Sequence, residues 1–189
     1  MLHRKTTTLV ECAIMLALSV VLSFVKVWEM PLGGSITLLS MLPISLISIK
    51  HGIKWGVATS FVYALLQLFL DIGKVMTWGL TAEMLIGCLL YDYLFAFTAI
   101  GLAGLFRSYG RGGMCVGIGL ALFLRFVSHF ISGGIVFAAW CPEEWSNPLL
   151  YSVCYNGAYM LPEMILTMAA TLIISKLPTV KRLVYPASC

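Results

Sequence analysis

Charged residues are scarce in this chain, and their scarcity argues against an ordinary soluble protein. Only 11% of the 189 residues are Asp, Glu, Lys or Arg, whereas 60% are hydrophobic. Soluble domains have about 25% charged and roughly 45–50% apolar residues. An apolar excess of this size cannot be buried in one small core, so much of it must face lipid. The composition therefore predicts a polytopic membrane protein.

The sequence also lacks the motifs that would give it an enzymatic chemistry of its own. It contains no GxxxxGK[ST] motif, so it cannot act as its own P-loop ATPase, and it contains neither HExxH nor GxSxG. Its six cysteines form no CxxC pair and indicate neither a metal site nor a disulfide framework. We expect a protein that is not an enzyme and that uses no metal ion or cofactor.

The apolar residues fall into six runs that are separated by short breaks. A membrane-spanning helix needs about 20 largely apolar residues. The breaks, including the one at 71–74, carry the Gly, Pro and charged residues that are typical of loops. We expect an all-α membrane protein in which residues 1–189 form a single six-helix transmembrane domain. The predicted helices are 7–27, 36–50, 53–71, 79–106, 113–138 and 148–176.

Six spans place both termini on one side of the membrane, and the basic residues identify that side. Nine Lys and Arg residues lie in the termini and the turns on that side, against two in the opposite loops. This asymmetry predicts cytoplasmic termini. Trp28, Trp78, Trp140 and Trp145 lie near the predicted outer ends, as aromatic belt residues do. The inner cations are Arg4, Lys5, Lys50, Lys54, Arg107, Arg111, Lys176, Lys181 and Arg182, and the outer ones are Lys26 and Lys74.

One acid lies in the middle of an apolar helix. The segment 83–106 contains Asp92, which is flanked by Tyr91 and Tyr93. A carboxylate at bilayer depth is costly, so it should face a cavity or a partner. The partner could be a cationic ligand, a proton or Arg125 of the next helix. An Arg125–Asp92 ion pair would satisfy both charges and leave no counter-charge for a ligand, and the residues alone leave this alternative open.

The last two predicted helices carry polar side chains at similar depth. Arg125, His129, Gly133 and Phe137 recur every four residues, so they share one helix face. On the following helix, Asn156 lies at about the same distance from the outer end as His129. Together the two helices predict a pocket that opens outward. The tyrosines that share a face near Asn156 are Tyr151, Tyr155 and Tyr159.

The first predicted helix contains a pair of small residues. Ala13 and Ala17 lie one turn apart, and small-xxx-small spacing lets helices approach closely in lipid. The pair could pack against a neighbouring helix of the same chain. It could instead form a docking surface for another membrane subunit.

Four long segments resemble a known family. The chain is similar to the substrate-binding (S) components of the thiamine transporters in the energy-coupling factor class, the ThiT or YuaJ family. The likeness covers nearly the whole chain. It rests on MPLGGSITLLSMLPISLISIKHGIKWG at 30–56, YDYLFAFTAIGLAGLF at 91–106, RFVSHFISGG at 125–134 and YSVCYNGAYMLPE at 151–163.

The resemblance implies a function and a set of site residues. It implies the six-helix S-component fold in a prokaryotic plasma membrane, with a thiamine pocket near the outer face. It also implies a transmembrane coupling protein and two ATPase subunits as partners, and no nucleic acid. In the family an acid and a tyrosine contact the thiazolium ring, and small residues of the first helix dock the coupling protein. The matching positions here are Asp92, Tyr93, His129, Gly133, Tyr151 and Asn156 for the pocket, and Ala13 and Ala17 for docking.

Three positions depart from relatives. Some relatives have Glu where this chain has Asp92, which has a shorter reach. Some have a stacking tryptophan where this chain has Phe137, a weaker cation–π partner. In the first loop, certain relatives have an aromatic residue where this chain has Gly34 and Ser35. We include Gly34 among the candidate site residues.

A second function also fits the residues. A proton-coupled secondary carrier for a cationic small molecule would use Asp92 and His129 as proton sites and would need no ATPase. Such carriers often show inverted internal repeats, and we find no convincing repeat here.

Because only Lys26 and Lys74 are available in the outer loops to bind a phosphate, the sequence favours unphosphorylated thiamine as the ligand.

Overall fold

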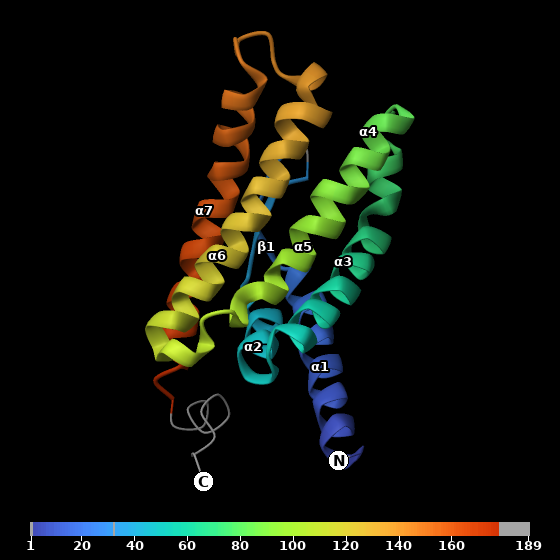
Figure 1. The fold of residues 1–189 in the computed structure, drawn as a ribbon. Helices are drawn as coiled ribbons and strands as arrows, with labels where there is room; N and C mark the ends of the chain where they lie inside the picture. The colour runs from blue at the N-terminus through green and yellow to red at the C-terminus, as the bar shows by residue number, and fades with distance from the viewer. Residues whose placement is uncertain (1, 32, 178–189) are drawn as a thin grey trace.

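Helices form nearly all of the molecule and run along its long dimension (Figure 1). The computed structural model describes residues 2–31 and 33–177. The six-helix, mostly α-helical architecture predicted from the sequence is confirmed. Its continuous α-helices are α1 (Leu2–Ser23), α2 (Leu42–His51), α3 (Ile53–Met76), α6 (Gly110–Ile131) and α7 (Pro148–Ile174).

The fourth and fifth helices change their winding along their length. The fourth begins as α4 (Ala82–Gly87), becomes π-helical, returns to α-helix as α5 (Ala96–Thr98) and ends as a 3₁₀-helix. The fifth begins as a 3₁₀ turn, continues as α6 and ends in a π-helical turn. The irregular segments are the π-helical Cys88–Phe95 and Ser132–Val136 and the 3₁₀-helical Ala99–Gly104, Arg107–Tyr109 and Ala138–Trp140.

Five helices of the described residues are long and apolar enough to cross a membrane, and the second is not. Helix α2 has 10 residues, and at about 1.5 Å per residue it spans roughly half of a bilayer core. The predicted helix 36–50 was therefore wrong at its start, because residues 35–37 form a strand instead. The five candidate spans are Lys5–Ser23, Ile53–Met76, Ala82–Gly104, Arg107–Val136 and Pro148–Ile174.

A short β-hairpin lies between the first two helices and includes residues that the sequence assigned to the ends of both. Strands β1 (Lys26–Glu29) and β2 (Ser35–Thr37) pair antiparallel, and the turn between them includes Gly33 with a positive φ of 100°. The predicted first helix, 7–27, therefore ends too late, since residues 26–27 belong to β1. Strands of four and three residues offer too little alternation for a sequence pattern to detect.

Helix α3 is longer at its outer end than the sequence predicted. We expected a loop at 71–74, but the α-helix continues without a break to Met76. One glycine inside a helix costs only about 1 kcal/mol relative to alanine, so Gly73 does not end it. The correction places Asp71 and Lys74 on a helix, where their side chains have defined directions.

Close packing closes the end of the molecule where α2 meets the 3₁₀ segment Ala99–Gly104. A Cβ atom on Gly101 would lie 2.5 Å from the Cα of Val57, and one on Gly104 would overlap the carbonyl oxygen of Ser48. The Ser48 hydroxyl donates to the Gly101 carbonyl oxygen and accepts from the Gly104 amide at 2.9 Å. These contacts leave no space for a ligand here.

Helix α1 begins and α7 ends at this packed end (Figure 1). The turn between α2 and α3, with Lys50 and Lys54, lies there too. We call it the inner end, because its basic residues assign it to the cytoplasm by the positive-inside rule. The predicted inner cations Lys181 and Arg182 lie outside the described residues.

Candidate ligand-binding site

A cavity of about 240 Å³ lies between the hairpin and the outer halves of four helices. Carboxylate, imidazole, amide and hydroxyl groups line it together with many aromatic rings. The eight candidate site residues predicted from the sequence all line this one cavity, although they come from four separate parts of the chain. They are Gly34, Asp92, Tyr93, His129, Gly133, Phe137, Tyr151 and Asn156.

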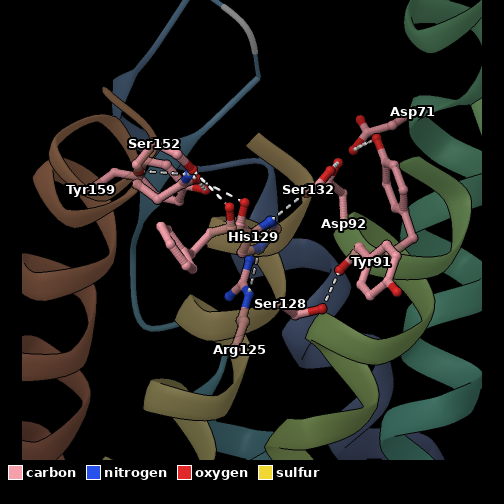
Figure 2. A network of polar contacts seen from close by, with 12 residues as sticks. Asp71, Tyr91, Asp92, Arg125, Ser128, His129, Ser132, Ser152 and Tyr159 are labelled. Carbon is pink, nitrogen blue, oxygen red and sulfur yellow. Dashed lines mark hydrogen bonds and ion pairs between the residues drawn. The ribbon is translucent and has the colours of Figure 1, made fainter. Parts of the chain in front are cut away.

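Asp92 lies at the centre of a hydrogen-bonded network (Figure 2). Its Oδ1 atom is 2.9 Å from His129 Nδ1, and its Oδ2 atom accepts a hydrogen bond of 2.5 Å from the Ser132 hydroxyl. About a fifth of the Asp92 side chain, 22%, remains exposed. The carboxylate is therefore held by two protein donors and still faces the cavity.

Arg125 does not pair directly with Asp92. Its Nε atom donates to His129 Nε2 at 3.3 Å, and its guanidinium carbon lies 4.3 Å from the centroid of the Phe97 ring. A further contact joins Arg125 Nη1 to the sulfur of Met41. No described carboxylate forms an ion pair with Arg125. The structure therefore excludes the direct Arg125–Asp92 ion pair that the sequence left open.

The position of Arg125 also determines the tautomer of His129. Arginine can only donate, so His129 Nε2 must accept, and the ring proton must then lie on Nδ1, which donates to Asp92. In this arrangement the imidazole is neutral. Asp92 consequently receives two hydrogen bonds but no neutralising charge from its neighbours.

Asp92 and its hydrogen-bond donor Ser132 both lie in π-helical segments. Asp92 belongs to Cys88–Phe95, and Ser132 and Gly133 belong to Ser132–Val136. A single extra residue in a turn shifts all later side chains by about 100° around the helix, and π turns often occur at functional sites. The two helices are also joined where Ser128 donates to the Tyr91 carbonyl oxygen at 2.6 Å.

Asn156 and Gly133 bring α6 and α7 together beside the cavity. The Asn156 amide nitrogen donates to the His129 carbonyl oxygen at 3.3 Å, and its oxygen accepts from the Tyr159 hydroxyl at 2.7 Å. A Cβ atom on Gly133 would lie 2.5 Å from the Ser152 hydroxyl oxygen. The missing side chain at Gly133 therefore permits the close approach that positions Asn156.

Helix α7 contributes a ladder of aromatic rings. The centroids of Tyr151 and Tyr155 lie 5.7 Å apart, and those of Tyr155 and Tyr159 lie 6.2 Å apart. The Tyr159 ring in turn meets His129 edge-on at 6.1 Å. The shared face predicted for the three tyrosines is confirmed, and it points toward the network around Asp92.

The sequence analysis missed several residues that line the cavity. Asp71 was assigned to a loop, and Trp78 and Trp140 were assigned to the aromatic belt. In the structure, Phe137 lies 5.3 Å from Trp140 and 6.5 Å from Trp78 between ring centroids. The missed residues of α3 recur at helical spacing and so share one face of the helix. We overlooked this spacing because we expected a loop at 71–74. On α3 the missed residues are Tyr63, Gln67 and Asp71, in line with Lys74, and Trp78 follows just beyond the end of the helix at Met76.

A small cluster of charges links the hairpin to α3 beside the cavity. Glu29 of β1 accepts hydrogen bonds from Lys26 at 2.8 Å and from Lys74 at 2.9 Å. These two bonds lower the pKa of Glu29 to about 2. Lys26 and Lys74 both line the cavity, but their ammonium groups are already engaged.

The hairpin is also held from within by a buried acid whose partner the sequence did not reveal. Glu163 of α7 is only 1% exposed, and it accepts hydrogen bonds of 2.7 Å from both the amide and the hydroxyl group of Thr37. In addition, a Cβ atom on Gly34 would overlap the Tyr159 ring. The hairpin is thereby fixed against α7 and forms one wall of the cavity.

The predicted docking pair lies away from the cavity. Ala13 and Ala17 are both exposed on α1, next to the exposed side chains of Ile14 and Leu18. The alternative in which the pair packs against another helix of this chain is therefore wrong. The described residues contain no group of three His, Cys, Asp or Glu side chains that could hold a metal ion.

The carboxylate and the aromatic rings of the cavity are groups that can bind a small cation. Asp92 supplies a negative charge that no described cation neutralises by direct contact, and tyrosine, tryptophan and phenylalanine rings surround it. Aromatic faces and an unneutralised carboxylate are the groups that recognise a cation without hydrogen-bond donors.

Comparisons with known proteins identify the family of this chain. The family described as "Thiamine transporter protein (Thia_YuaJ)" matches residues 9–182. A protein of Bacillus subtilis (strain 168) named "Thiamine transporter ThiT" is 35% identical over 178 residues, which cover 86% of this chain and 87% of that protein. Another of the same name from Lacticaseibacillus paracasei is 27% identical, over 87% of this chain and 85% of its own length.

A solved structure shares the fold. It is titled "Native-SAD phasing for ThiT from Listeria monocytogenes serovar", and it superimposes with a TM-score of 0.75 over 96% of this chain and 98% of its own. At 22% identity, this likeness concerns the fold alone. The extent of the family match and the identity to the Bacillus protein show that this chain is a multi-pass membrane protein of the thiamine transporter (Thia_YuaJ) family.

Proposed function

We propose that this chain captures thiamine in the outer cavity and delivers it inward as the substrate-binding subunit of an energy-coupling factor transporter. The names of its relatives supply the ligand. The observation that carries the proposal is the Asp92 carboxylate, which receives two hydrogen bonds yet has no cationic partner among the residues that the structure describes. We propose no catalytic step and no cofactor.

The chemistry of thiamine explains why such a carboxylate is needed. The thiazolium ring carries a permanent positive charge and no N–H group that could donate a hydrogen bond, so its charge must be matched by a counter-charge or by aromatic faces. Asp92 supplies the first, and Tyr93, Phe137 and Trp140 can supply the second at about 0.5–2 kcal/mol for each close contact. Phe137 is a weaker cation–π partner than the tryptophan that some relatives have at this position, and the neighbouring Trp140 ring can make up for that difference.

The polar groups on α6 and α7 would orient the neutral part of the ligand. His129 and Asn156 are held by protein hydrogen bonds, so they present fixed groups to the cavity. Tyr151 lies beside them on the aromatic ladder. Because Lys26 and Lys74 are both bonded to Glu29, we favour unphosphorylated thiamine over its phosphate esters.

We propose that Ala13 and Ala17 dock a transmembrane coupling protein, which in turn meets two ATPase subunits. Their exposure on α1 supports this role. Replacement of both by leucine should leave thiamine binding unchanged and abolish ATP-driven uptake in cells that contain the coupling module. Uptake that survives this change would reject the docking surface.

The direct test of the ligand is calorimetric titration of the purified chain with thiamine, riboflavin and biotin. We expect tight binding of thiamine alone. Equal binding of riboflavin, or no binding of thiamine, would reject the proposal. Uptake that persists without the ATPases but collapses with the proton gradient would instead favour a proton-coupled carrier that uses Asp92 and His129.

A further inference from the structure

The cavity contains a second carboxylate that the proposed function does not use. Asp71 lies on α3 and lines the same cavity as Asp92, which lies on the helix beside it. Its Oδ2 atom accepts a hydrogen bond of 3.3 Å from the Tyr93 hydroxyl group (Figure 2). Since Tyr93 directly follows Asp92 in the sequence, the two acids are connected through one short stretch of helix.

No described cation neutralises Asp71. Lys74 lies one turn further along α3 but donates to Glu29 at 2.9 Å. Arg125 is directed toward His129, Met41 and the Phe97 ring. Among the described residues, Asp71 forms no ion pair, and its single hydrogen bond occupies one of its two carboxylate oxygens.

Asp71 therefore adds a second negative charge to the wall that carries Asp92, while the cations that also line the cavity, Lys26, Lys74 and Arg125, contact other groups. Two partly buried carboxylates share one small space, and each would repel the other without a positive charge between them. A ligand with a permanent positive charge relieves that repulsion, whereas a neutral ligand of the same shape does not. This difference is a source of selectivity that is separate from the fit of the rings.

We propose that Asp71 is a second anionic specificity residue, which selects a permanently cationic ring and holds the Tyr93 hydroxyl group in place beside it. The inference rests on the proposed function, because it takes thiamine as the cation. It assigns to α3 a share in ligand recognition, in addition to the parts contributed by the hairpin, the fourth helix, α6 and α7.

The test compares thiamine with a neutral isostere in which carbon replaces the quaternary ring nitrogen. Calorimetry on the purified full-length chain should show that Asp71→Asn weakens thiamine binding about tenfold, as expected for loss of a nearby charge in a partly solvated site. The isostere should lose less than about twofold by the same reasoning. The ratio of the two affinities is therefore the measured quantity.

Two further variants separate charge from position. Tyr93→Phe removes the hydroxyl group but keeps both carboxylates, so it should weaken both ligands alike and leave the ratio unchanged. Asp71→Asn in the Tyr93→Phe background should again lower the ratio, because the hydrogen bond is already absent there. Glu83→Gln removes an exposed carboxylate at the start of α4 that does not line the cavity, and it serves as the matched control.

The outcomes distinguish this inference from the proposed function. A wild-type chain that binds thiamine, with an unchanged ratio in Asp71→Asn, would overturn the role of Asp71 alone. An equal loss of both ligands would do the same, since it would mean that Asp71 only supports Tyr93. A wild-type chain that binds neither ligand would overturn the proposed function and this inference together.

Discussion

The outer and inner halves of the fourth helix differ in winding, and the difference explains where the cavity lies. The outer half is π-helical over Cys88–Phe95 and carries Asp92 and Tyr93 into the cavity. The inner half is a tighter 3₁₀-helix over Ala99–Gly104, in which Gly101 is packed against Val57 and Gly104 against Ser48. One helix therefore provides both a wide, polar binding wall and a dry structural contact. Binding and stability should respond to substitutions in different halves.

The largest expected effect is on binding, at the outer half. Asp92→Asn leaves the bound thiazolium without its principal counter-charge, and breaking a buried ion pair costs roughly 3–5 kcal/mol. Because the side chain is partly exposed, we expect the lower end of that range, or about 100-fold weaker binding. Calorimetry of the purified chain measures it, and the midpoint of thermal unfolding without ligand should not fall.

The control for this prediction is Glu83→Gln, an equal change of charge outside the cavity. It should bind thiamine as the wild type does. An Asp92→Asn variant that keeps its affinity within threefold would show that the aromatic rings, rather than the carboxylate, recognise the cation.

The second expected effect is on stability, at the inner half. Gly104→Ala drives a methyl group into the carbonyl oxygen of Ser48, and backbone atoms cannot rotate away as a side chain can. Overpacking of this kind costs about 1–3 kcal/mol, and we expect the upper end, or roughly 6–10 °C in the midpoint of thermal unfolding for a chain of this size.

Gly119→Ala is the matched control, because its new methyl group would lie 3.6 Å from the sulfur of Met168, an ordinary contact. It should not lower the unfolding midpoint. If the Gly104→Ala protein that remains folded also loses thiamine affinity, the two halves are not independent and the comparison fails.

A third, smaller effect tests the boundary between binding and packing. Gly133→Ala places a methyl group 2.5 Å from the Ser152 hydroxyl oxygen, but that hydroxyl group can rotate away at the loss of its 2.9 Å hydrogen bond to the Phe130 carbonyl oxygen. We expect thiamine binding to weaken by about 1–1.5 kcal/mol, the net value of one hydrogen bond. Ser152→Ala removes the same hydrogen bond while Gly133 is kept, so it should weaken binding by a similar amount, and unchanged binding in that variant would place the cause elsewhere.

The same comparison shows what could be read from the sequence. The inner half was predictable, because apolar periodicity and basic turns specify helices and their orientation. Much of the outer half was predictable residue by residue, since Asp92 is an acid within an apolar helix and His129 and Asn156 are polar groups at similar depth on the last two helices. Their assembly in one cavity followed from that pattern and from the resemblance to a family.

What the sequence did not reveal depends on local backbone choices of small energy. A π turn differs from an α turn by one residue of register, and no composition signal marks it, so the contact of Asp92 with Ser132 was not foreseen. Gly73 within α3 was taken for a break, which hid Asp71. The partners of Arg125 and Glu163 depend on contacts between distant segments, and periodicity within one helix carries no information about them.

The smallest expected effect concerns the charged residues that join the hairpin to α3 at the outer end of the molecule. The pKa of Glu29 is lowered from 4.5 to about 2 by hydrogen bonds from Lys26 and Lys74. A folded-state pKa below the unfolded value means that the ionised form stabilises the fold above about pH 4.5 and that this contribution disappears as the pH falls toward 2. Because these groups are exposed, salt should screen the contribution strongly.

Glu29→Gln should therefore lower the midpoint of thermal unfolding only slightly at pH 7 and low salt, and not at all in about 1 M salt, where the screening length is roughly 3 Å. Thiamine affinity should stay within about twofold, since surface ion pairs contribute at most about 1 kcal/mol. A larger loss of affinity that salt does not reproduce would mean that Glu29 holds the hairpin wall in its binding position. In that case binding and stability would not respond separately at the outer end of the molecule, because the shape of the cavity there would depend on the hairpin being held in place.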